Sequence, residues 1–145
     1  MPALDVSKKS YLPAKFEVCQ SGEKVCILGL GNFFKIAKKA AEILKEKHGV
    51  SASLVNPLYS NILDTKLLDE ISKTHKIFVT IEDGVLAGGF GESVASHLSK
   101  TGVKVLNFGA EKEFTDNVPL NELRERFGVT SENIVSNILD ALKHV

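Results

Sequence analysis

The chain has 145 residues, of which 43% are hydrophobic, and this is enough for one domain with a core of its own. Its 18 basic and 18 acidic side chains cancel, so no net field would draw it to nucleic acid or to an anionic membrane. No apolar run approaches the roughly 20 residues that span a bilayer. With two cysteines and no signal-peptide pattern at the start, the sequence favours a reducing, cytoplasmic compartment.

Residues 1–15 show no periodic pattern and contain Pro2 and Pro13, which is typical of a linker or an extended arm. Residues 16–145 are expected to form a single domain. This domain opens with two β-rich runs, FEVCQ and EKVCILG, which a short polar turn separates. A connection of this length cannot form a parallel crossover, so we expect the two strands to be antiparallel neighbours.

Helical and extended patterns alternate in the rest of the chain. Helical spacing, with Asp64 as an N-cap and Gly49 as a C-terminal stop, is found in residues 32–49, 64–75, 92–99, 119–128 and 130–144. Extended runs lie between them, in residues 50–58, 76–81 and 103–109. This order predicts an α/β fold: a three-layer α/β/α sandwich with a five-stranded mixed sheet, mostly parallel with the first strand antiparallel.

The motif GLGNFF, residues 29–34, follows a predicted strand and opens a predicted helix. A dinucleotide fingerprint needs a small residue where Phe34 stands, and the acidic residue expected about 20 positions later is replaced by Asn56-Pro57. The motif therefore argues against nicotinamide or flavin binding. The free amides near Gly31 could still receive an anion or the carboxylate of a partner.

The second glycine-rich motif, AGGFGES, follows the acids Glu82 and Asp83 at the end of a predicted central strand. It lacks the lysine and the spacing of a phosphate-binding P-loop. Its glycines could permit positive φ and close backbone approach, and one of the two acids could cap the helix end or the loop amides. Adjacent strand residues point to opposite faces, so the two acids do not form an acid–base pair.

Other reactive groups are sparse. The four histidines lie mostly in or near predicted helix ends, where surface or dipole-compensating roles are the simple interpretation: His48, His75, His97 and His144. Cysteine and histidine are too few and too scattered for a zinc site. No nucleophile elbow is present, and catalysis by this chain alone is not expected.

The segment VTIEDGVLAGGFGESVASHL, residues 79–98, closely resembles the C-terminal domain of the transketolase-like enzymes that use thiamine diphosphate. The resemblance extends from about Phe16 onward, with Pro57, His75 and Glu82 in matching places. The ending is most similar to that of 1-deoxy-D-xylulose 5-phosphate synthases. Two departures stand out: NPLYS replaces a segment with a lysine and an aspartate, and NFGAEKE lacks the usual arginine.

The resemblance implies that thiamine diphosphate and Mg²⁺ are bound in the complete enzyme only, by a cofactor-binding domain and a middle domain outside this chain. It implies a C-terminal domain that packs on those domains and supports a homodimer. The positions expected to contact another domain or an anion are Gly31, Asn56, Glu82, Gly88, Gly89, Phe90 and Gly91. None of them is expected to be catalytic, to bind the cofactor or to ligate a metal.

The leading hypothesis is thus a non-catalytic domain or subunit of a thiamine-diphosphate-dependent transferase, most similar to the synthases that condense pyruvate with glyceraldehyde 3-phosphate and release carbon dioxide. Its expected partners are the missing domains and a second copy, with no nucleic acid and no membrane. The alternative is a stand-alone module, without catalytic activity, that binds a small anion or serves dimerisation.

Overall fold

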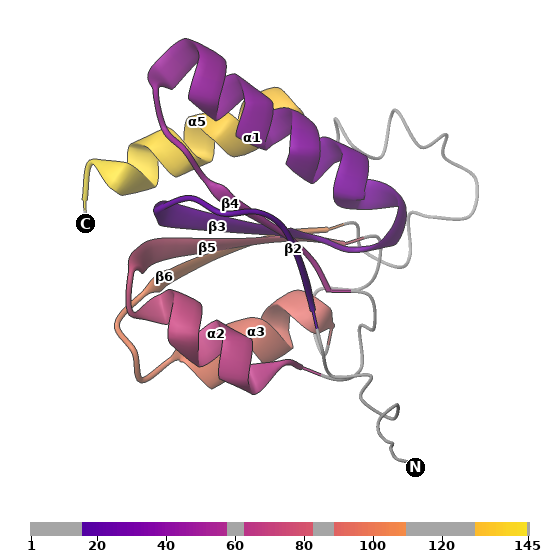
Figure 1. Cartoon of the computed structure of the whole chain (residues 1–145), viewed down its shortest axis with the longest axis vertical. Coiled ribbons are helices and arrows are strands. Elements are labelled where there is room, and N and C mark those ends of the chain that lie inside the picture. The colour runs from indigo at the N-terminus through magenta and orange to yellow at the C-terminus, as the bar shows by residue number, and fades with distance from the viewer. Residues whose placement is uncertain (1–15, 58–62, 83–88, 110–129, 145) are drawn as a thin grey trace.

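In the computed structural model, which describes residues 16–57, 63–82, 89–109 and 130–144, a central sheet lies between two layers of helices (Figure 1). Helices α1 (Phe34–His48) and α5 (Ser131–Leu142) cover one face, and α2 (Thr65–Ser72) and α3 (Phe90–Leu98) cover the other. This arrangement confirms the predicted three-layer α/β/α sandwich. The helix expected over residues 119–128, the arm over residues 1–15 and the site residue Gly88 lie outside the described residues.

The sheet has five strands in the spatial order β2-β4-β3-β5-β6. Their bounds are β2 Glu17–Gln20, β3 Lys24–Gly29, β4 Ser53–Asn56, β5 His75–Glu82 and β6 Lys104–Gly109. The pairs β3–β4, β3–β5 and β5–β6 are parallel, whereas β2 is antiparallel to β4. The mixed, mostly parallel sheet with an antiparallel first strand is therefore confirmed.

The expected pairing of the first two strands was wrong, because β2 lies beside β4 and not beside β3. Both edges of β3 are already occupied by its parallel partners β4 and β5, so β2 adds to the free edge of β4. The turn between β2 and β3 passes over the start of β4, where the Glu23 amide donates to the Ser51 carbonyl at 2.8 Å. A short turn fixes the relative direction of two strands, and it does not require them to be adjacent.

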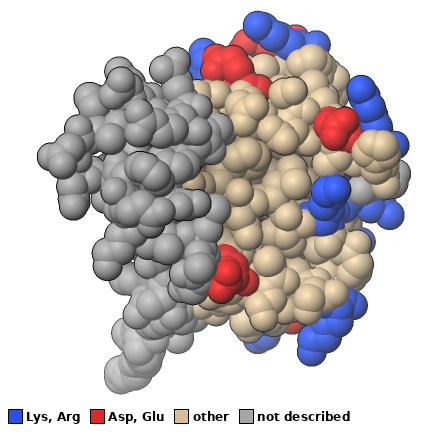
Figure 2. Space-filling model, turned by 180° about the vertical axis from the view of Figure 1, so that it is seen from behind, with Lys and Arg blue, Asp and Glu red and all other residues tan. Residues whose placement is uncertain are grey.

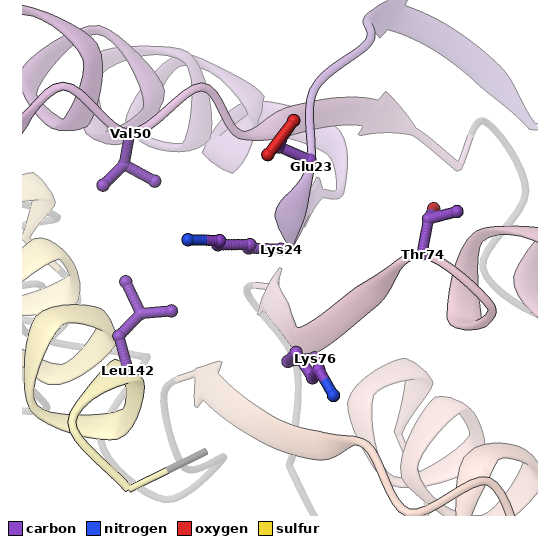
Figure 3. Close-up of a pocket in the computed structure, with 6 residues that line it drawn as sticks. All are labelled: Glu23, Lys24, Val50, Thr74, Lys76 and Leu142. Atoms are coloured by element: carbon purple, nitrogen blue, oxygen red, sulfur yellow. The ribbon is translucent and has the colours of Figure 1, made fainter.

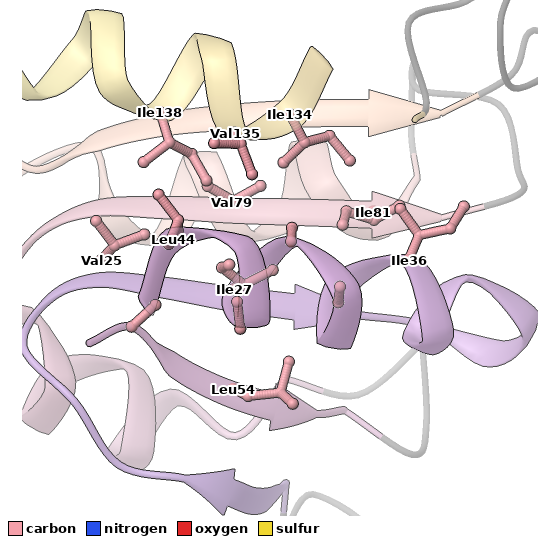
Figure 4. Packing of buried hydrophobic residues seen from close by; sticks show 14 of the residues in the cluster. Val25, Ile27, Ile36, Leu44, Leu54, Val79, Ile81, Ile134, Val135 and Ile138 are labelled. Atoms are coloured by element: carbon pink, nitrogen blue, oxygen red, sulfur yellow. The ribbon is translucent and has the colours of Figure 1, made fainter. Parts of the chain in front are cut away.

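Two apolar clusters hold the three layers together, one on each face of the sheet. In the first, shown in Figure 4, residues of β3, β4 and β5 pack against α1 and α5; the fully buried members include Val25, Ile27, Leu44, Val79, Ile134 and Ile138. The second joins the same strands to α2 and α3 through residues such as Leu28, Leu68, Phe78, Val94 and Leu98. Each such side chain contributes about 1.5–3 kcal/mol on burial, so both helix layers are firmly attached to the sheet.

The ends of the helices follow local chemistry. The Asp64 carboxylate accepts a hydrogen bond from the Leu67 amide, as expected of an N-cap, and the Thr130 hydroxyl accepts one from the Asn133 amide. Gly49 ends α1 with a φ of 67°, in the left-handed region that glycine occupies without strain. None of the helices in the described parts of the chain is long and apolar enough to cross a bilayer.

Candidate functional site

The parallel strands end together at one edge of the sheet, and most of the predicted site residues lie there. Asn56 is the last residue of β4, Glu82 the last of β5, and Gly31 follows the end of β3 by two positions. Gly89, Phe90 and Gly91 stand at the start of α3. This is the edge at which open α/β sheets bind ligands and partners.

The Glu82 side chain forms the centre of this edge. It is only 4% exposed, and its carboxylate accepts hydrogen bonds from the backbone amides of Phe90 (3.1 Å) and Gly91 (2.5 Å). The residue before α3, Gly89, has no side chain to cap the helix, so a carboxylate from the neighbouring strand serves instead. The negative charge also lies at the positive end of the helix dipole. The hypothesis that one of the two acids caps this helix is confirmed for Glu82.

This cap explains why α3 begins at Phe90, two residues before the predicted start at Glu92. It also changes what the glycine motif can bind. A phosphate or carboxylate ligand would need the free amides at the helix start, and the Glu82 carboxylate already occupies those of Phe90 and Gly91. Small-anion binding by this chain would therefore need other donors.

Gly91 is required for close packing and not for an unusual backbone conformation. A Cβ atom at this position would lie 2.5 Å from Thr80 Oγ1 and 2.8 Å from the side-chain carbonyl oxygen of Asn107. Those two side chains are joined by a hydrogen bond of 2.6 Å from Thr80 Oγ1 to Asn107 Oδ1, across β5 and β6. The first turn of α3 therefore rests directly on the sheet, as the close-approach interpretation of this glycine predicted.

Phe90 connects the glycine motif to the first described residue of the chain. Its side chain is 3% exposed and meets the ring of Phe16 edge to face, with centroids 6.1 Å apart. The Phe16 amide donates to Asp64 Oδ2 at 2.9 Å, so the cap of α2 also anchors this segment. The ring of Phe90 is thus engaged within the domain, and contact of this motif with a neighbouring domain stays a proposal.

The first glycine motif packs differently. Gly31 has a φ of 59° and is exposed within the short 3-10 helix η1 (Gly31–Phe33) that precedes α1. The close approach occurs two residues earlier, since a Cβ atom at Gly29 would lie 2.7 Å from Ala37 Cβ. The amides of Leu30 and Phe33 donate to Ile81 and Leu30 carbonyls. Two backbone amides of this turn therefore already have acceptors within the domain. The residue at which the turn packs closely is Gly29, which the sequence did not single out.

The described residues contain no cluster of metal ligands and no activated thiol. Among residues 16–57, 63–82, 89–109 and 130–144, no group of three histidine, cysteine, aspartate or glutamate side chains could hold a metal ion. Burial raises the pKa of the Cys26 thiol, and burial together with the Glu17 carboxylate raises the pKa of the Cys19 thiol, so neither is an activated nucleophile at neutral pH.

A hollow of about 650 Å³ lies at the opposite edge of the sheet, where the strands begin. Figure 3 shows that its two lysines do not converge: the Lys24 side chain extends between Val50 and Leu142, whereas Lys76 points away. An anion held between two lysines would need both ammonium groups on the same side. The hollow therefore does not compete with the carboxyl edge as the candidate site.

Comparison with known proteins agrees with the family resemblance found in the sequence. The family described as transketolase, C-terminal domain, matches residues 14–134. The 1-deoxy-D-xylulose-5-phosphate synthase of Caldanaerobacter subterraneus subsp. tengcongensis is 35% identical over 144 residues, which are 97% of this chain and 23% of that protein. A synthase of the same name from a Synechococcus strain is 36% identical over 126 residues, 86% of this chain and 19% of that protein.

Solved structures agree. A split gene transketolase, an inactive beta4 tetramer, superposes with a TM-score of 0.81 at 29% identity, over 98% of this chain and 46% of that one. The transketolase of Campylobacter jejuni subsp. jejuni superposes with a TM-score of 0.60 at 20% identity, over 89% of this chain and 19% of that one, which shows a shared fold. The chain spans about a fifth of the length of the synthases it matches. It belongs to the transketolase C-terminal domain family.

Proposed function

We propose that the chain is the C-terminal, non-catalytic domain or subunit of a 1-deoxy-D-xylulose 5-phosphate synthase. The observation that carries this proposal is the 35% identity to such a synthase along 97% of the chain. In the complete enzyme, pyruvate and glyceraldehyde 3-phosphate would be condensed with loss of carbon dioxide. The domain itself would pack against the other domains and contribute to dimer assembly. The complete enzyme would be cytoplasmic.

The carboxyl edge of the sheet supports a role in packing. Glu82 holds the start of α3 on β5, and the ring of Phe16 packs on Phe90 at the start of that helix. Residues 1–15 would lead to a preceding domain, so this contact would set the direction in which that domain lies.

The cofactor would be bound elsewhere. Thiamine diphosphate supplies the ylid that adds to pyruvate, and its diphosphate is held through Mg²⁺, for which the described residues offer no group of three His, Cys, Asp or Glu ligands. We therefore assign thiamine diphosphate and Mg²⁺ to the cofactor-binding and middle domains of the complete enzyme. Isothermal titration of the isolated chain should show no binding of thiamine diphosphate with Mg²⁺ at millimolar concentration, and measurable affinity would contradict this assignment.

A chimeric enzyme tests the proposal. In the Caldanaerobacter synthase, the segment that matches this chain would be replaced by residues 1–145, and product formation from pyruvate and glyceraldehyde 3-phosphate would be measured. The matched controls are the native synthase and the synthase lacking that segment. We expect the chimera to sediment as the native enzyme does and to be clearly more active than the truncated form.

A chimera that folds and assembles but is no more active than the truncated enzyme would contradict the proposal. The same assay with the chain added as a separate polypeptide to the truncated enzyme distinguishes a domain from a subunit. Activity in the fused form alone indicates a domain, and activity in both forms indicates a chain that can act as a subunit. Self-association of the isolated chain, measured by sedimentation, tests the dimer contribution by itself.

A further inference from the structure

Strand β6 forms one edge of the sheet. Within the described residues it pairs with β5 alone, in parallel and without a register shift along its six residues. A strand at the edge of a sheet leaves a row of backbone amides and carbonyls unpaired on its outer side. No other described segment forms a backbone hydrogen bond with β6, so these groups need either water or a further strand.

The apolar side chains of β6 are only partly covered by the domain. Val105, Leu106 and Phe108 are half-buried, whereas the residues beside them on β5 are fully buried. The exposed part of each side chain therefore lies on the side away from β5. Leu106 and Phe108 belong to the face that α1 and α5 cover, and Val105 belongs to the face that α2 and α3 cover. A strand laid along β6 would thus extend both apolar clusters.

The other edge of the sheet is protected against such pairing. Strand β2 has only four residues, and its register shifts between Val18 and Gln20. Short length, a bulge and charged side chains are the usual protections of an exposed edge. Strand β6 is longer and regular, and its one charged side chain is Lys104, at its first position. The β6 edge is therefore the one that suits a further strand.

A second copy of the chain is the partner that this edge fits. In Figure 1, β2 lies toward the viewer and β6 toward the back, so Figure 2 shows the molecule from the β6 side. Acidic and basic side chains both lie around the uncharged centre of the described part of that side. A strongly charged partner is therefore not favoured, and no field of one sign would repel an identical copy. An edge strand also matches itself in the antiparallel direction, which closes a symmetric dimer.

We propose that β6 of one copy pairs antiparallel with β6 of a second copy, so that the two five-stranded sheets become one continuous sheet. With Leu106 opposite Leu106 of the second copy, Lys104 lies opposite Phe108 and Val105 opposite Asn107, and each face of the sheet stays continuous. The two Lys104 side chains then lie roughly 13 Å apart along the strands, whereas a parallel pair would place them side by side. This inference rests on the dimer assembly of the proposed function and assigns it a surface.

Cysteine cross-linking of the chain of residues 1–145 tests the pairing and its register. The background variant is Cys19→Ser, which removes the exposed native thiol. In that background, Leu106→Cys would place two thiols opposite each other, with Cβ atoms about 4.5–5.5 Å apart, and mild oxidation should give a covalent dimer. Lys104→Cys is the matched control, because its two thiols would lie too far apart for a disulfide. Equal cross-linking of the two variants, or none with Leu106→Cys, would overturn the proposal.

Sedimentation measures the same contact without a new thiol. Leu106→Lys would set two ammonium groups face to face in the middle of the pair, so the Kd of the dimer should rise about tenfold or more. Val18→Lys, at the exposed apolar side chain of the other edge, is the matched control and should leave the Kd unchanged. Circular dichroism checks that both variants fold, and the cross-linking decides the matter if Leu106→Lys does not.

A chain that stays monomeric at every concentration contradicts the pairing, as does a dimer that Val18→Lys dissociates and Leu106→Lys does not. The chimera assay decides the proposed function separately. An active chimera combined with either of these results would therefore remove the β6 contact and leave the proposed function standing.

Discussion

Strand β5 holds a buried polar side chain at each end, and the two ends are built differently. At its carboxyl end the charged Glu82 binds two backbone amides of α3 directly. At its amino end the neutral His75 reaches the Gly22 amide through the Ser53 hydroxyl. Glu82 accepts directly from backbone amides of a neighbouring segment, whereas at the other end it is Ser53, in contact with His75, that accepts from the backbone of the turn before β3.

The two ends of β5 differ in the strength of the hydrogen bonds that hold the neighbouring segment. A carboxylate accepts charge-assisted hydrogen bonds and interacts favourably with the helix dipole, so two strong hydrogen bonds hold the start of α3. A neutral imidazole accepts one ordinary hydrogen bond and can be protonated near neutral pH. The carboxyl end therefore has a charged acceptor at the start of α3, whereas the contacts at the amino end join a hydroxyl group and an imidazole.

The largest effect is expected from removal of the carboxylate. Glu82→Ala leaves the buried amides of Phe90 and Gly91 without an acceptor, and each such loss costs about 1–3 kcal/mol. We expect the free energy of unfolding of the isolated domain to fall by about 3 kcal/mol in urea denaturation. Glu46→Ala, on the exposed side of α1, is the matched control and should change it by less than about 0.5 kcal/mol. Equal effects of the two variants would refute the assigned role.

A somewhat smaller effect is expected from Gly91→Ala. The new methyl group would meet Thr80 Oγ1 and the Asn107 side chain, both held by their mutual hydrogen bond, and overpacking of this kind costs about 1–3 kcal/mol. Ser96→Ala in the same helix controls for the helix propensity of alanine and should be neutral or slightly stabilising. Thermal unfolding of both variants measures the difference. A stabilised Gly91→Ala would show that α3 can move away from the sheet.

These two residues also show what sequence alone could predict. The alternation of strands and helices specified the sandwich, and the position of Glu82 after a buried strand made it a candidate cap. The sequence suggested both positive φ and close backbone approach for the glycines of this motif, and at Gly91 the coordinates show the close approach without the positive φ. The resemblance of residues 79–98 to the family identified the domain. It did not show which atoms accept the hydrogen bonds of the free amides at the start of α3.

Other features depend on contacts between distant parts of the chain. Strand β2 pairs with β4 because β4 has a free edge, and no local sequence pattern encodes this pairing. Phe16 and Phe90 meet across the domain, and His75 meets Ser53 only because the sheet brings the starts of β4 and β5 close together. Sequence patterns predict elements and their directions, whereas these pairs arise from the order of strands in the sheet.

The aromatic pair gives a third, intermediate prediction. Phe16→Leu should lower the free energy of unfolding by about 1 kcal/mol, because it removes part of a buried ring that packs edge to face on Phe90. Phe90→Leu and the double variant complete a mutant cycle, measured by urea denaturation. We expect a coupling energy of about 0.5–1.5 kcal/mol between the two positions. Additive effects would mean that the rings are buried side by side without a specific interaction.

The smallest expected effect is a change in the slope of the unfolding free energy against pH. A histidine whose folded pKa lies below 6.5 binds fewer protons in the folded than in the unfolded protein, so stability is complete above pH 6.5 and falls as pH decreases below it. His75→Gln should flatten the curve of unfolding free energy against pH just below 6.5, since glutamine does not titrate. His97→Gln should leave that slope in place, because its pair with Asp69 is largely exposed and contributes little.

The two variants must be compared through slopes and not through absolute stability. His75→Gln also changes the buried packing beside Phe78, so a lower stability at pH 8 would not by itself speak for titration. A flattened slope in His75→Gln with an unchanged slope in His97→Gln assigns the pH dependence to the amino end of β5. If the slope of unfolding free energy against pH is unchanged in His75→Gln, a group other than His75 causes the pH dependence. The contacts at the amino end of β5 then do not depend on the protonation of His75.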